Sequence, residues 1–570
     1  MAHLSSQPSY IRHDICSFYC ARSSRDSAPK PRTATLRKLY DPSDPDHVEP
    51  RVLDTGALLL FFPAPNTVTG ADVLELHVHG GPAIVRSILN AISKHGRSSR
   101  VRDGAIRHAE PGEFTKWAFY NGRLDLTQAE ALGETLAAET EQQRRLAVSG
   151  TDGGLAKRYE EWRTMLLCAR GELEALIDFS EDQHFDESPA EFMSSISEQV
   201  VALKRQVELH LLNASRGELL RNGISIALLG APNAGKSSLL NRIVGREAAI
   251  VSAEEGTTRD IVDVSVDLNG WLCRVGDMAG LRSKEQSVIG SIEQEGIRRA
   301  RERALQSDVV VVLLSIEMDA DRKPTVSING EVLEAVQECH ATGKTILAVL
   351  NKIDLVVDQP RANKEAARDL HTRVCQILPM VPAGRICMIS CRRASDDPTA
   401  SDPDPGSIQA FLTVLTDAFS ELTTASTGEI RDNRMTAAEA QSYWTASLSV
   451  THRQSTYLSE GLRHLDDFLS LACYPQSQPS QAQSYLPTES DGTMEFAHSS
   501  DPNGYHGDRH KNLDAPNIVS DPDAHAHADD IVDIVTAAEH LRFAADCFAK
   551  ITGKGESGDV EDILGVVFEK

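Results

Sequence analysis

The chain has no stretch that approaches the run of about 18 apolar residues needed to span a membrane, so we expect no transmembrane segment. Positive charge is also scarce, because 58 Lys and Arg stand against 83 Asp and Glu, a net charge of −25. This balance argues against a protein that coats nucleic acid through bulk charge, although it leaves room for a local basic patch. The ten cysteines contain no CxxC pair, and the close spacings Cys16/Cys20 and Cys387/Cys391 lack a second half. We therefore expect reduced thiols in a reducing compartment.

Two segments differ in composition from the rest of the 570 residues, a length that suits about three or four domains. Residues 1–33 are Ser-rich with an excess of basic residues, which is typical of an organellar presequence or of an unstructured terminus. Residues 474–529 are rich in Ser, Pro, Gln, Asp and His and predict a disordered insertion. The Asp-Ala-His-Ala-His-Ala-Asp run at 523–529 could collect metal, but solvated low complexity is its ordinary interpretation.

Residues 34–124 have the pattern of a small α+β domain. Strands are predicted at Leu58–Phe62 and Val73–Val78, followed by a helix that begins at Pro82 and carries an apolar stripe. His77 and His79 flank the end of the second strand. Because no third ligand is evident, we expect structural or ligand-contacting roles for them rather than metal binding.

Residues 221–422 predict a doubly wound α/β domain, because apolar strand cores alternate with helix-like stretches. The five strand cores are Ile224–Leu229, Trp271–Val275, Val309–Leu314, Thr345–Leu350 and Ile386–Ile389. Residues 125–220 and 423–570, on either side, have helical periodicity and predict a helical domain in two parts. Helical spacing is clearest at Thr127–Leu136, Glu198–Leu212, Ala437–Leu471 (including Val450–Gln454) and Ile531–Lys550.

A glycine-rich loop, Gly230-Ala-Pro-Asn-Ala-Gly-Lys-Ser-Ser238, follows the first of these strands and precedes an amphipathic segment. Strand, loop and helix in this order are the context of a phosphate-binding loop, although a chance match in a glycine-rich turn is the alternative. Backbone N–H groups of such a loop surround phosphate oxygens, while Lys236 would reach the β- and γ-phosphates and Ser237 would hold Mg²⁺. The candidate nucleotide-binding residues of the loop are Asn233, Ala234, Gly235, Lys236, Ser237 and Ser238.

Four further motifs follow the loop in the order that a GTPase requires. Gly256-Thr-Thr-Arg-Asp260 offers Thr257 and Thr258, of which Thr258 is the better Mg²⁺ ligand. In Asp277-Met-Ala-Gly280, Asp277 would hold Mg²⁺ through water and the Gly280 N–H would face the γ-phosphate.

The last two motifs predict which base is bound. Asn351-Lys-Ile-Asp354 ends a strand, and the Asp354 carboxylate would accept hydrogen bonds from guanine N1–H and N2–H₂, which adenine does not offer. Ile389-Ser-Cys391 ends the final strand, where it would support the base. Each motif is weak alone, but their common order predicts a GTP-binding enzyme that hydrolyses GTP.

The water-activating residue is harder to identify. No glutamine after Asp277 is placed to orient water, as one does in Ras-type switches. Asn233, with loop carbonyls near Ser252–Gly256, could hold a monovalent cation that stabilises charge between the β- and γ-phosphates. Glu293 could position the attacking water, although a solvated helix glutamate is the default interpretation.

Together these segments closely resemble the MnmE/TrmE family of tRNA-modification GTPases in its mitochondrial form. Outside the insertion, the resemblance covers most of residues 30–570. The segments that carry it are Pro63–Gly70, Asp72–Pro82, Pro111–Thr115, Asn121–Glu130, Ile177–Phe179, Gly230–Ser238, Gly256–Asp260, Asn351–Asp354, Ile551–Gly553 and Asp562–Gly565. The fold implied is an α/β P-loop GTPase domain inserted in an α-helical domain, behind a small α+β folate-binding-like domain.

The resemblance also implies cofactors and partners. A homodimer would form through the N-terminal domains, with Glu75 and Arg123 at positions that contact 5-formyltetrahydrofolate. The G domains would pair across K⁺, held by Asn233 with Ser252, Glu254 and Thr257, and Glu293 would orient water. With an FAD-containing MnmG/GidA-type partner, the protein would install a carboxymethylaminomethyl or taurinomethyl group on C5 of the tRNA wobble uridine in the mitochondrial matrix.

Three positions depart from the family pattern. Residues 1–30 lack its first strand and the Gly-Arg-Gly-Gly-like loop whose arginine contacts folate. The chain stops at Phe568-Glu-Lys570, before the Phe-Cys-(Ile/Val)-Gly-Lys motif, and Cys547 lies on the wrong helix to replace that cysteine. Met278 stands where the family has threonine, with a mild expected effect. We expect the terminal differences to affect folate binding and tRNA modification and to leave GTP hydrolysis intact.

Two other functions compete with this one. A ribosome-assembly GTPase would share the phosphate loop and the potassium chemistry, but it predicts an RNA-binding domain after the G domain, where residues 421–570 are instead helical. A nucleotide-gated scaffold without modification activity is the non-enzymatic alternative.

Overall fold

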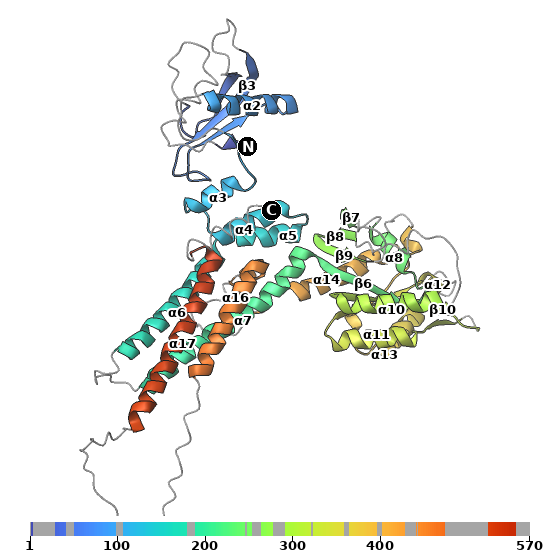
Figure 1. Cartoon of the computed structure of the whole chain (residues 1–570). Coiled ribbons are helices and arrows are strands. Elements are labelled where there is room, and N and C mark those ends of the chain that lie inside the picture. The colour runs from blue at the N-terminus through green and yellow to red at the C-terminus, as the bar shows by residue number, and fades with distance from the viewer. Residues whose placement is uncertain are drawn as a thin grey trace, which may run out of the picture. The chain divides into compact units, whose positions relative to one another are not determined.

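The computed structural model (Figure 1) divides into two compact units, which are described separately. The first comprises residues 1–163, 205–460 and 546–570, and the second comprises residues 164–204 and 461–545. The residues described are 2–3, 29–41, 51–98, 107–178, 189–244, 248–253, 264–276, 291–320, 323–357, 364–395, 402–427, 441, 443–472 and 522–554.

The N-terminal part of the first unit is an α+β domain, as predicted. Strands β2 (Thr35–Tyr40), β3 (Val52–Phe62) and β4 (Val73–His77) form an antiparallel sheet in the order β2-β3-β4. Helix α2 (Pro82–Ser98) contributes Ile88 to a core shared with residues of the sheet. Alternate residues of β3 are buried, because successive side chains of a strand point to opposite faces.

Residues 1–33, predicted as a presequence or an unstructured terminus, form backbone pairs where the structure describes them. Strand β1 (Ala2–His3) pairs with β5 (Arg107–His108), and Pro31 bridges to Phe61. The Arg32 N–H donates to the Phe61 carbonyl at 2.8 Å, so this segment joins the sheet. Residues 4–28 lie outside the described part.

Helix α3 (Glu113–Tyr120) is followed by α4 (Leu126–Ala137) and α5 (Glu141–Gly150). Asp125 and Thr140 each cap a helix, and Gln128 and Gln143 complete two capping boxes. The long helices predicted on either side of the G domain are also present: α6 (Gly154–Asp178), α7 (Pro189–Asn222), α16 (His452–Ala472) and α17 (Pro522–Thr552).

Two predicted boundaries change. Val450 is extended, so Val450–Gln454 is not one helix, and α16 begins at His452 after the short η4 (Ala446–Ser449). Helix α17 begins at Pro522, inside the segment predicted as a disordered insertion. Residues 473–521 lie outside the described part. In the second unit, buried residues recur at helical spacing on all four long helices, for example Ile196, Val200 and Leu203 on α7.

The G domain contains all five predicted strands: β6 (Ile224–Gly230), β9 (Trp271–Val275), β10 (Val309–Met318), β12 (Thr345–Asn351) and β13 (Ile386–Met388). Sequence reading missed β7 (Ala248–Ala253), β8 (Val264–Leu268) and the edge strand β11 (Pro324–Val326). The sheet order is β13-β12-β10-β6-β9-β8-β7, with β11 paired to β10. Strands β13, β12, β10, β6 and β9 run parallel, whereas β7 and β8 extend the sheet antiparallel.

The sheet is buried on both faces. Along β10, Val309, Val311 and Leu313 belong to one core cluster, and the residues between them belong to another. Helices α8 (Lys236–Arg242), α10 (Ser291–Gln306), α11 (Gly330–Ala341), α12 (Asp354–Val357), α13 (Lys364–Ile377) and α14 (Ile408–Thr423) connect the strands or follow the last of them. Such a two-sided core explains why its strands appear as continuous apolar runs.

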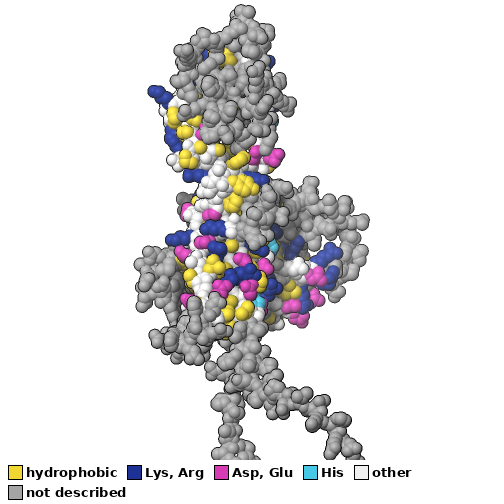
Figure 2. Space-filling model, turned by 60° about the vertical axis from the view of Figure 1, so that its left-hand side comes forward, with side chains coloured by type: hydrophobic (Ala, Val, Ile, Leu, Met, Phe, Trp, Pro, Cys, Tyr) yellow, Lys and Arg dark blue, Asp and Glu magenta, His cyan; other side chains and the backbone are white. Residues whose placement is uncertain are grey.

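No helix in the part of the chain that the structure describes is long and apolar enough to cross a membrane. Basic and acidic side chains are interspersed on the described surface visible in Figure 2. The cysteines among the described residues are free thiols, as expected.

Candidate nucleotide-binding site

The phosphate-loop sequence lies between β6 and α8, as predicted. Asn233 and Gly235 have positive φ values of 64° and 102°. A Cβ on Gly235 would lie 2.2 Å from Nδ2 of Asn351, so both the backbone conformation and the space require glycine here. Asn233, Ser237 and Ser238 are exposed, whereas Ala234 is buried beneath the loop.

Lys236 begins α8 and folds back over the loop. Its Nζ atom donates to the carbonyl oxygens of Gly230 at 2.7 Å and Ala231 at 3.1 Å. These bonds hold the ammonium group at the loop, where the first N–H groups of a helix also lack partners within the helix. The arrangement is that of an anion-binding loop.

A second group of residues lies at the carboxyl ends of β12 and β13, which are parallel neighbours. Asp354 and Ser390 are buried, and the Ser390 hydroxyl donates to Oδ1 of Asp354 at 2.6 Å. Among the described residues, no hydrogen bond is made to Oδ2 of Asp354. A buried carboxylate with this remaining capacity fits the recognition of two N–H donors on a guanine edge.

Asn351 links this group to the phosphate loop. Its Nδ2 donates to the Ala234 carbonyl at 2.9 Å, while its Oδ1 accepts from Lys352 N at 2.8 Å and Cys391 N at 3.2 Å. One side chain therefore joins three segments that are far apart in sequence. We call Gly230–Ser238 together with Asn351, Asp354 and Ser390 the nucleotide edge.

The sequence did not predict the role of Gly406, whose backbone contacts Ser390. The Ser390 N–H donates to the Gly406 carbonyl at 2.9 Å, and Gly406 has a φ of 91°. A Cβ at this position would lie 2.4 Å from the Ser390 carbonyl oxygen. Pro405-Gly406 is a recognisable turn signal, but nothing in the sequence says which strand the turn approaches.

Cys391 is not a reactive group of the site. Burial raises the pKa of its thiol to about 11, so it stays protonated near neutral pH.

The catalytic and metal-binding predictions concentrate in segments outside the described residues. Ser252 lies on β7 and Glu293 on α10, but the placement of neither side chain is described. The residues that lie outside altogether are Glu254, Gly256, Thr257, Thr258, Asp277 and Gly280. Their roles stay predictions.

In the N-terminal domain, the predicted folate-contacting residues Glu75 and Arg123 are both exposed. Glu75 pairs with His77, with 3.2 Å between Oε2 and Nε2. His79 instead has a structural role, since its backbone and ring N–H groups lie 2.9 and 2.8 Å from the carboxylate of buried Asp54. Burial alone would raise the pKa of Asp54, but hydrogen bonds from Gly56 and His79 outweigh it and lower that pKa.

The described residues supply groups suited to the base and the phosphates of GTP, and exposed oxygen atoms suited to a cation. The Asp354 carboxylate, the Lys236 ammonium and the strained loop backbone provide donors and acceptors that match a guanine base and phosphates. The exposed Ser237 hydroxyl is available to a cation beside the loop. Asn233 is likewise exposed, as a K⁺ ligand would need to be.

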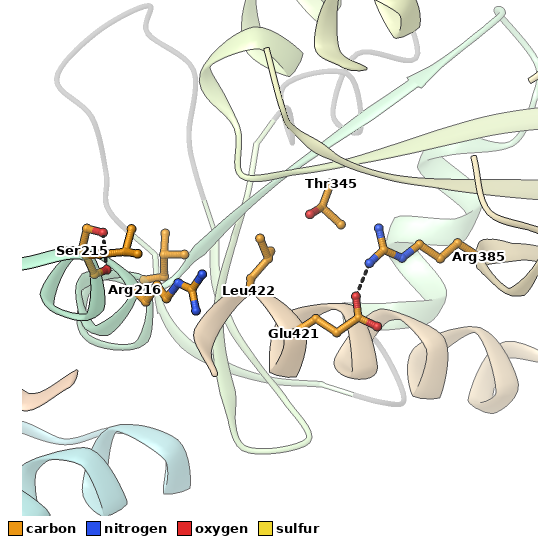
Figure 3. Close-up of a pocket in the computed structure, with 8 residues that line it drawn as sticks. Ser215, Arg216, Thr345, Arg385, Glu421 and Leu422 are labelled. Carbon is orange, nitrogen blue, oxygen red and sulfur yellow. Dashed lines mark hydrogen bonds and ion pairs between the residues drawn. The ribbon is translucent and has the colours of Figure 1, made fainter. Parts of the chain in front are cut away.

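A cavity of about 420 Å³ is separate from the nucleotide edge (Figure 3). It is bordered by Thr345 at the start of β12, by Ser215 and Arg216 of α7, and by the Arg385–Glu421 ion pair. Asn351 ends the same strand, and a strand rises about 3.3 Å per residue, so the cavity lies roughly 20 Å from the nucleotide edge. It is therefore not part of the candidate site.

Two family descriptions match the chain. The family "GTP-binding protein TrmE N-terminus" matches residues 13–123, and "MnmE helical domain" matches residues 126–486. The first match begins well before residue 34, the predicted start of the N-terminal domain.

Named relatives agree with these matches. The chain is 32% identical over 551 residues to the mitochondrial tRNA modification GTPase MSS1 of Saccharomyces cerevisiae, covering 95% of this chain and 85% of that protein. It is 43% identical over 335 residues to tRNA modification GTPase MnmE of Paramagnetospirillum magneticum, covering 59% and 68%. It is 38% identical over 367 residues to the mitochondrial 5-taurinomethyluridine-tRNA synthase subunit GTPB3 of Danio rerio, covering 64% and 67%.

Among solved structures, Era of Aquifex aeolicus is 19% identical and has a TM-score of 0.23, covering 37% of this chain and 60% of that chain. A similarity at this level carries no functional argument.

Proposed function

This chain belongs to the MnmE/TrmE family of tRNA modification GTPases, and from that premise we propose that it uses GTP hydrolysis to modify the wobble uridine of tRNA. The chain is a GTP-hydrolysing enzyme. The observation that carries the proposal is the nucleotide edge, where Asn351 joins the phosphate loop to the Asp354–Ser390 pair. Base selection and phosphate binding would thereby share one buried side chain.

The chain's own residues would act as follows. Asp354 would accept from guanine N1–H and N2–H₂, oriented by the Ser390 hydroxyl. Lys236 would exchange its carbonyl partners for the β- and γ-phosphates, where its charge offsets the negative charge that develops during transfer. Ser237 and Thr258 would hold Mg²⁺ directly and Asp277 through water, and the metal supplies charge neutralisation at the phosphates.

The finer mechanism is also part of the proposal. A K⁺ ion held by Asn233 and by residues 252–257 would support charge between the β- and γ-phosphates, in place of an arginine finger. Glu293 would orient the attacking water. The exposure of Asn233, at a positive φ in the loop, supports its assignment. Pairing of two G domains across this ion would couple hydrolysis to a homodimer.

The wider setting rests on the family and its named relatives. The GTPB3 relative is named as a subunit of a 5-taurinomethyluridine-tRNA synthase and as mitochondrial, which supports a partner protein and mitochondrial localisation for this chain. The partner proposed is the FAD-containing MnmG/GidA-type protein. Glu75 and Arg123 would contact 5-formyltetrahydrofolate.

The test is steady-state GTP hydrolysis by the full chain in KCl and in NaCl at equal ionic strength. We expect strong stimulation by K⁺, its loss in Asn233→Ala, and slow turnover with unchanged GTP affinity in Glu293→Ala. Lys236→Ala supplies the background rate. Cation-indifferent hydrolysis would contradict the K⁺ site and G-domain pairing, whereas unchanged turnover in Glu293→Ala would remove that residue from the mechanism.

The tRNA step needs its own readout. A strain that lacks its own family member should regain the modified wobble uridine, measured in purified tRNA by mass spectrometry, when it expresses this chain. Active GTP hydrolysis without recovery of the nucleoside would contradict the tRNA-modification proposal.

A further inference from the structure

Three potential metal ligands converge in the second unit, on the helices α16 and α17. His464 and Asp467 are three residues apart on α16, so they share one helix face, and His540 lies on α17. The Nδ1 atoms of the two histidines are 3.3 Å apart, and Oδ2 of Asp467 lies 3.8 Å from Nδ1 of His540. All three ligand atoms lie within 4.8 Å of one another.

The histidine pair is within hydrogen-bond distance, but the three atoms together are also spaced as the ligands of one metal ion would be. Zinc binds imidazole nitrogen and carboxylate oxygen at about 2.0–2.2 Å, so neighbouring tetrahedral ligand atoms lie roughly 3.3–3.5 Å apart. The histidine pair already has this separation. By contrast, 3.8 Å exceeds the range of a hydrogen bond from His540 to the carboxylate.

The surroundings hold the two rings and leave the carboxylate room to move. The His464 ring packs 5.3 Å from Phe543 and 5.5 Å from His540, measured between ring centroids. The His540 side chain is 22% exposed, whereas that of Asp467 is 48% exposed. Closing the sphere therefore requires movement mainly of a half-exposed surface carboxylate, while the two histidine nitrogens keep their separation.

We propose that His464, Asp467 and His540 bind one divalent transition-metal ion, Zn²⁺ by preference, with water as the fourth ligand. Two imidazoles and a carboxylate form a ligand set that suits Zn²⁺ and neighbouring metals, and three protein ligands with one water are a common zinc arrangement. The site is distinct from the Mg²⁺ and K⁺ positions of the G domain.

The ion braces α16 against α17. These helices are separated in sequence by residues 473–521, and the two histidines are 76 positions apart. Metal that binds the folded arrangement and not the unfolded chain stabilises the fold by mass action. Its expected effect is therefore a higher melting temperature of the helical unit, with no direct effect on GTP binding.

The experiment uses the full chain without a histidine tag, freed of metal with a chelator and kept in excess Mg²⁺. Titration with Co²⁺ should give one equivalent of a four-coordinate species, seen as an intense d–d absorption band, which one equivalent of Zn²⁺ displaces. Zn²⁺ should also raise the melting midpoint followed by helical circular dichroism. His464→Ala and His540→Ala should abolish the band.

Two variants keep the test valid if a histidine substitution unfolds the helices. Asp467→Ala retains both packed rings and should weaken Co²⁺ binding by about 10-fold or more, because loss of a direct ligand costs at least as much as loss of an outer-shell partner. Asp466→Ala is its matched control, because that neighbouring carboxylate pairs with Lys204 at 2.5 Å, and it should leave the affinity unchanged. Equal affinities for the two variants would overturn the proposal.

A second source of binding must also be separated from the cluster. The double variant His525→Ala/His527→Ala removes the histidines of the 523–529 run and should leave the band intact. A band lost with this double variant but retained in His464→Ala would overturn the proposal. An identical melting midpoint with and without Zn²⁺, with no Co²⁺ band, would likewise show that the histidines only pack and hydrogen-bond.

Discussion

The first unit contains two clusters of buried polar side chains, and they differ in how far their hydrogen-bonding capacity is used within the protein. The helical-core cluster (Glu130, Arg158, Tyr159, His210 and Gln454) makes nearly all of its hydrogen bonds within the protein. His210 is fully buried, with Arg158 Nη1 3.2 Å from its Nδ1 and the Tyr159 hydroxyl 2.9 Å from its Nε2. Since a guanidinium can only donate, Nδ1 accepts and Nε2 carries the proton.

The network continues from Tyr159 to Gln454, whose Nε2 donates to Glu130 at 2.6 Å. Arg453 and Thr451 bond to the same carboxylate. Among the polar side-chain atoms of this cluster, Nε of Arg158 is buried without a hydrogen-bond partner, and the other atoms bond to one another or to neighbouring residues. The Arg158 guanidinium also lies 3.3 Å from the centroid of the Tyr443 ring. This cation–π contact stabilises its charge in addition to the hydrogen bonds.

The nucleotide edge is built from similar groups but leaves capacity unused. Asp354 accepts from Ser390 through Oδ1 only, among the described residues, and Lys236 holds two carbonyls that a phosphate can replace. The comparison suggests a rule for this chain. Where buried polar groups satisfy one another, substitutions should cost stability, and where they leave a lone pair or a charge available, substitutions should cost function.

The largest expected effect is on turnover at the nucleotide edge. Lys236→Ala removes the charge that would face the β- and γ-phosphates and should reduce kcat for GTP by about 10³-fold or more. The melting midpoint should change little, because the lysine packs against the loop and not in a core. Lys157→Ala, whose side chain is 82% exposed, is the control. Wild-type turnover in Lys236→Ala would reject the phosphate-loop assignment.

The opposite pattern is expected in the helical-core cluster. His210→Leu removes one buried hydrogen-bond partner each from Arg158 and Tyr159 and should lower the free energy of unfolding by about 2–4 kcal/mol. GTP affinity should stay within about twofold of wild type. Chemical denaturation and nucleotide titration measure the two quantities, with exposed His452→Leu as the control. A loss of affinity without a loss of stability would reverse the comparison.

A smaller effect concerns pH. Burial, with the neighbouring Arg158 charge, lowers the pKa of His210 well below 6.5. Below pH 6.5 the unfolded chain gains a proton at this side chain that the folded chain does not bind, so stability falls as pH falls. The slope attributable to His210 is at most about 1.4 kcal/mol per pH unit, and it should vanish above pH 6.5. Denaturation of wild type and His210→Leu from pH 7.5 to 5 measures it, and equal slopes would contradict the assignment.

The sequence predicts the nucleotide edge better than it predicts the helical-core cluster, and the reason is physical. The phosphate loop and Asn351–Asp354 are local motifs that follow continuous apolar strands, so their positions at one sheet edge can be inferred. The bond from Asn351 to Ala234 spans 117 residues, and the Tyr159–Gln454 contact spans 295. Such partners are chosen by packing, which no local pattern records.

Two strands that were not predicted, and one helix that begins earlier than predicted, have a related explanation. Strands β7 and β8 are short and antiparallel, and because β7 pairs with β8 and β8 with β9, they depend on neighbouring strands rather than on their own composition. The predicted insertion extended to residue 529, but α17 begins at Pro522, because Ala-rich sequence is compatible with a helix whatever its polarity.

The central claim is that the nucleotide edge selects guanine through Asp354. A comparison of nucleotides that differ only in the base tests this claim most directly. Hydrolysis of GTP and of XTP should be measured for wild type, Asp354→Asn and Ser390→Ala. Wild type should prefer GTP by about 10²- to 10³-fold, and Asp354→Asn should reverse the preference, because its amide can donate to the xanthine carbonyl. Ser390→Ala should weaken GTP use by about 5- to 10-fold without reversal. Unchanged GTP preference in Asp354→Asn would contradict the account.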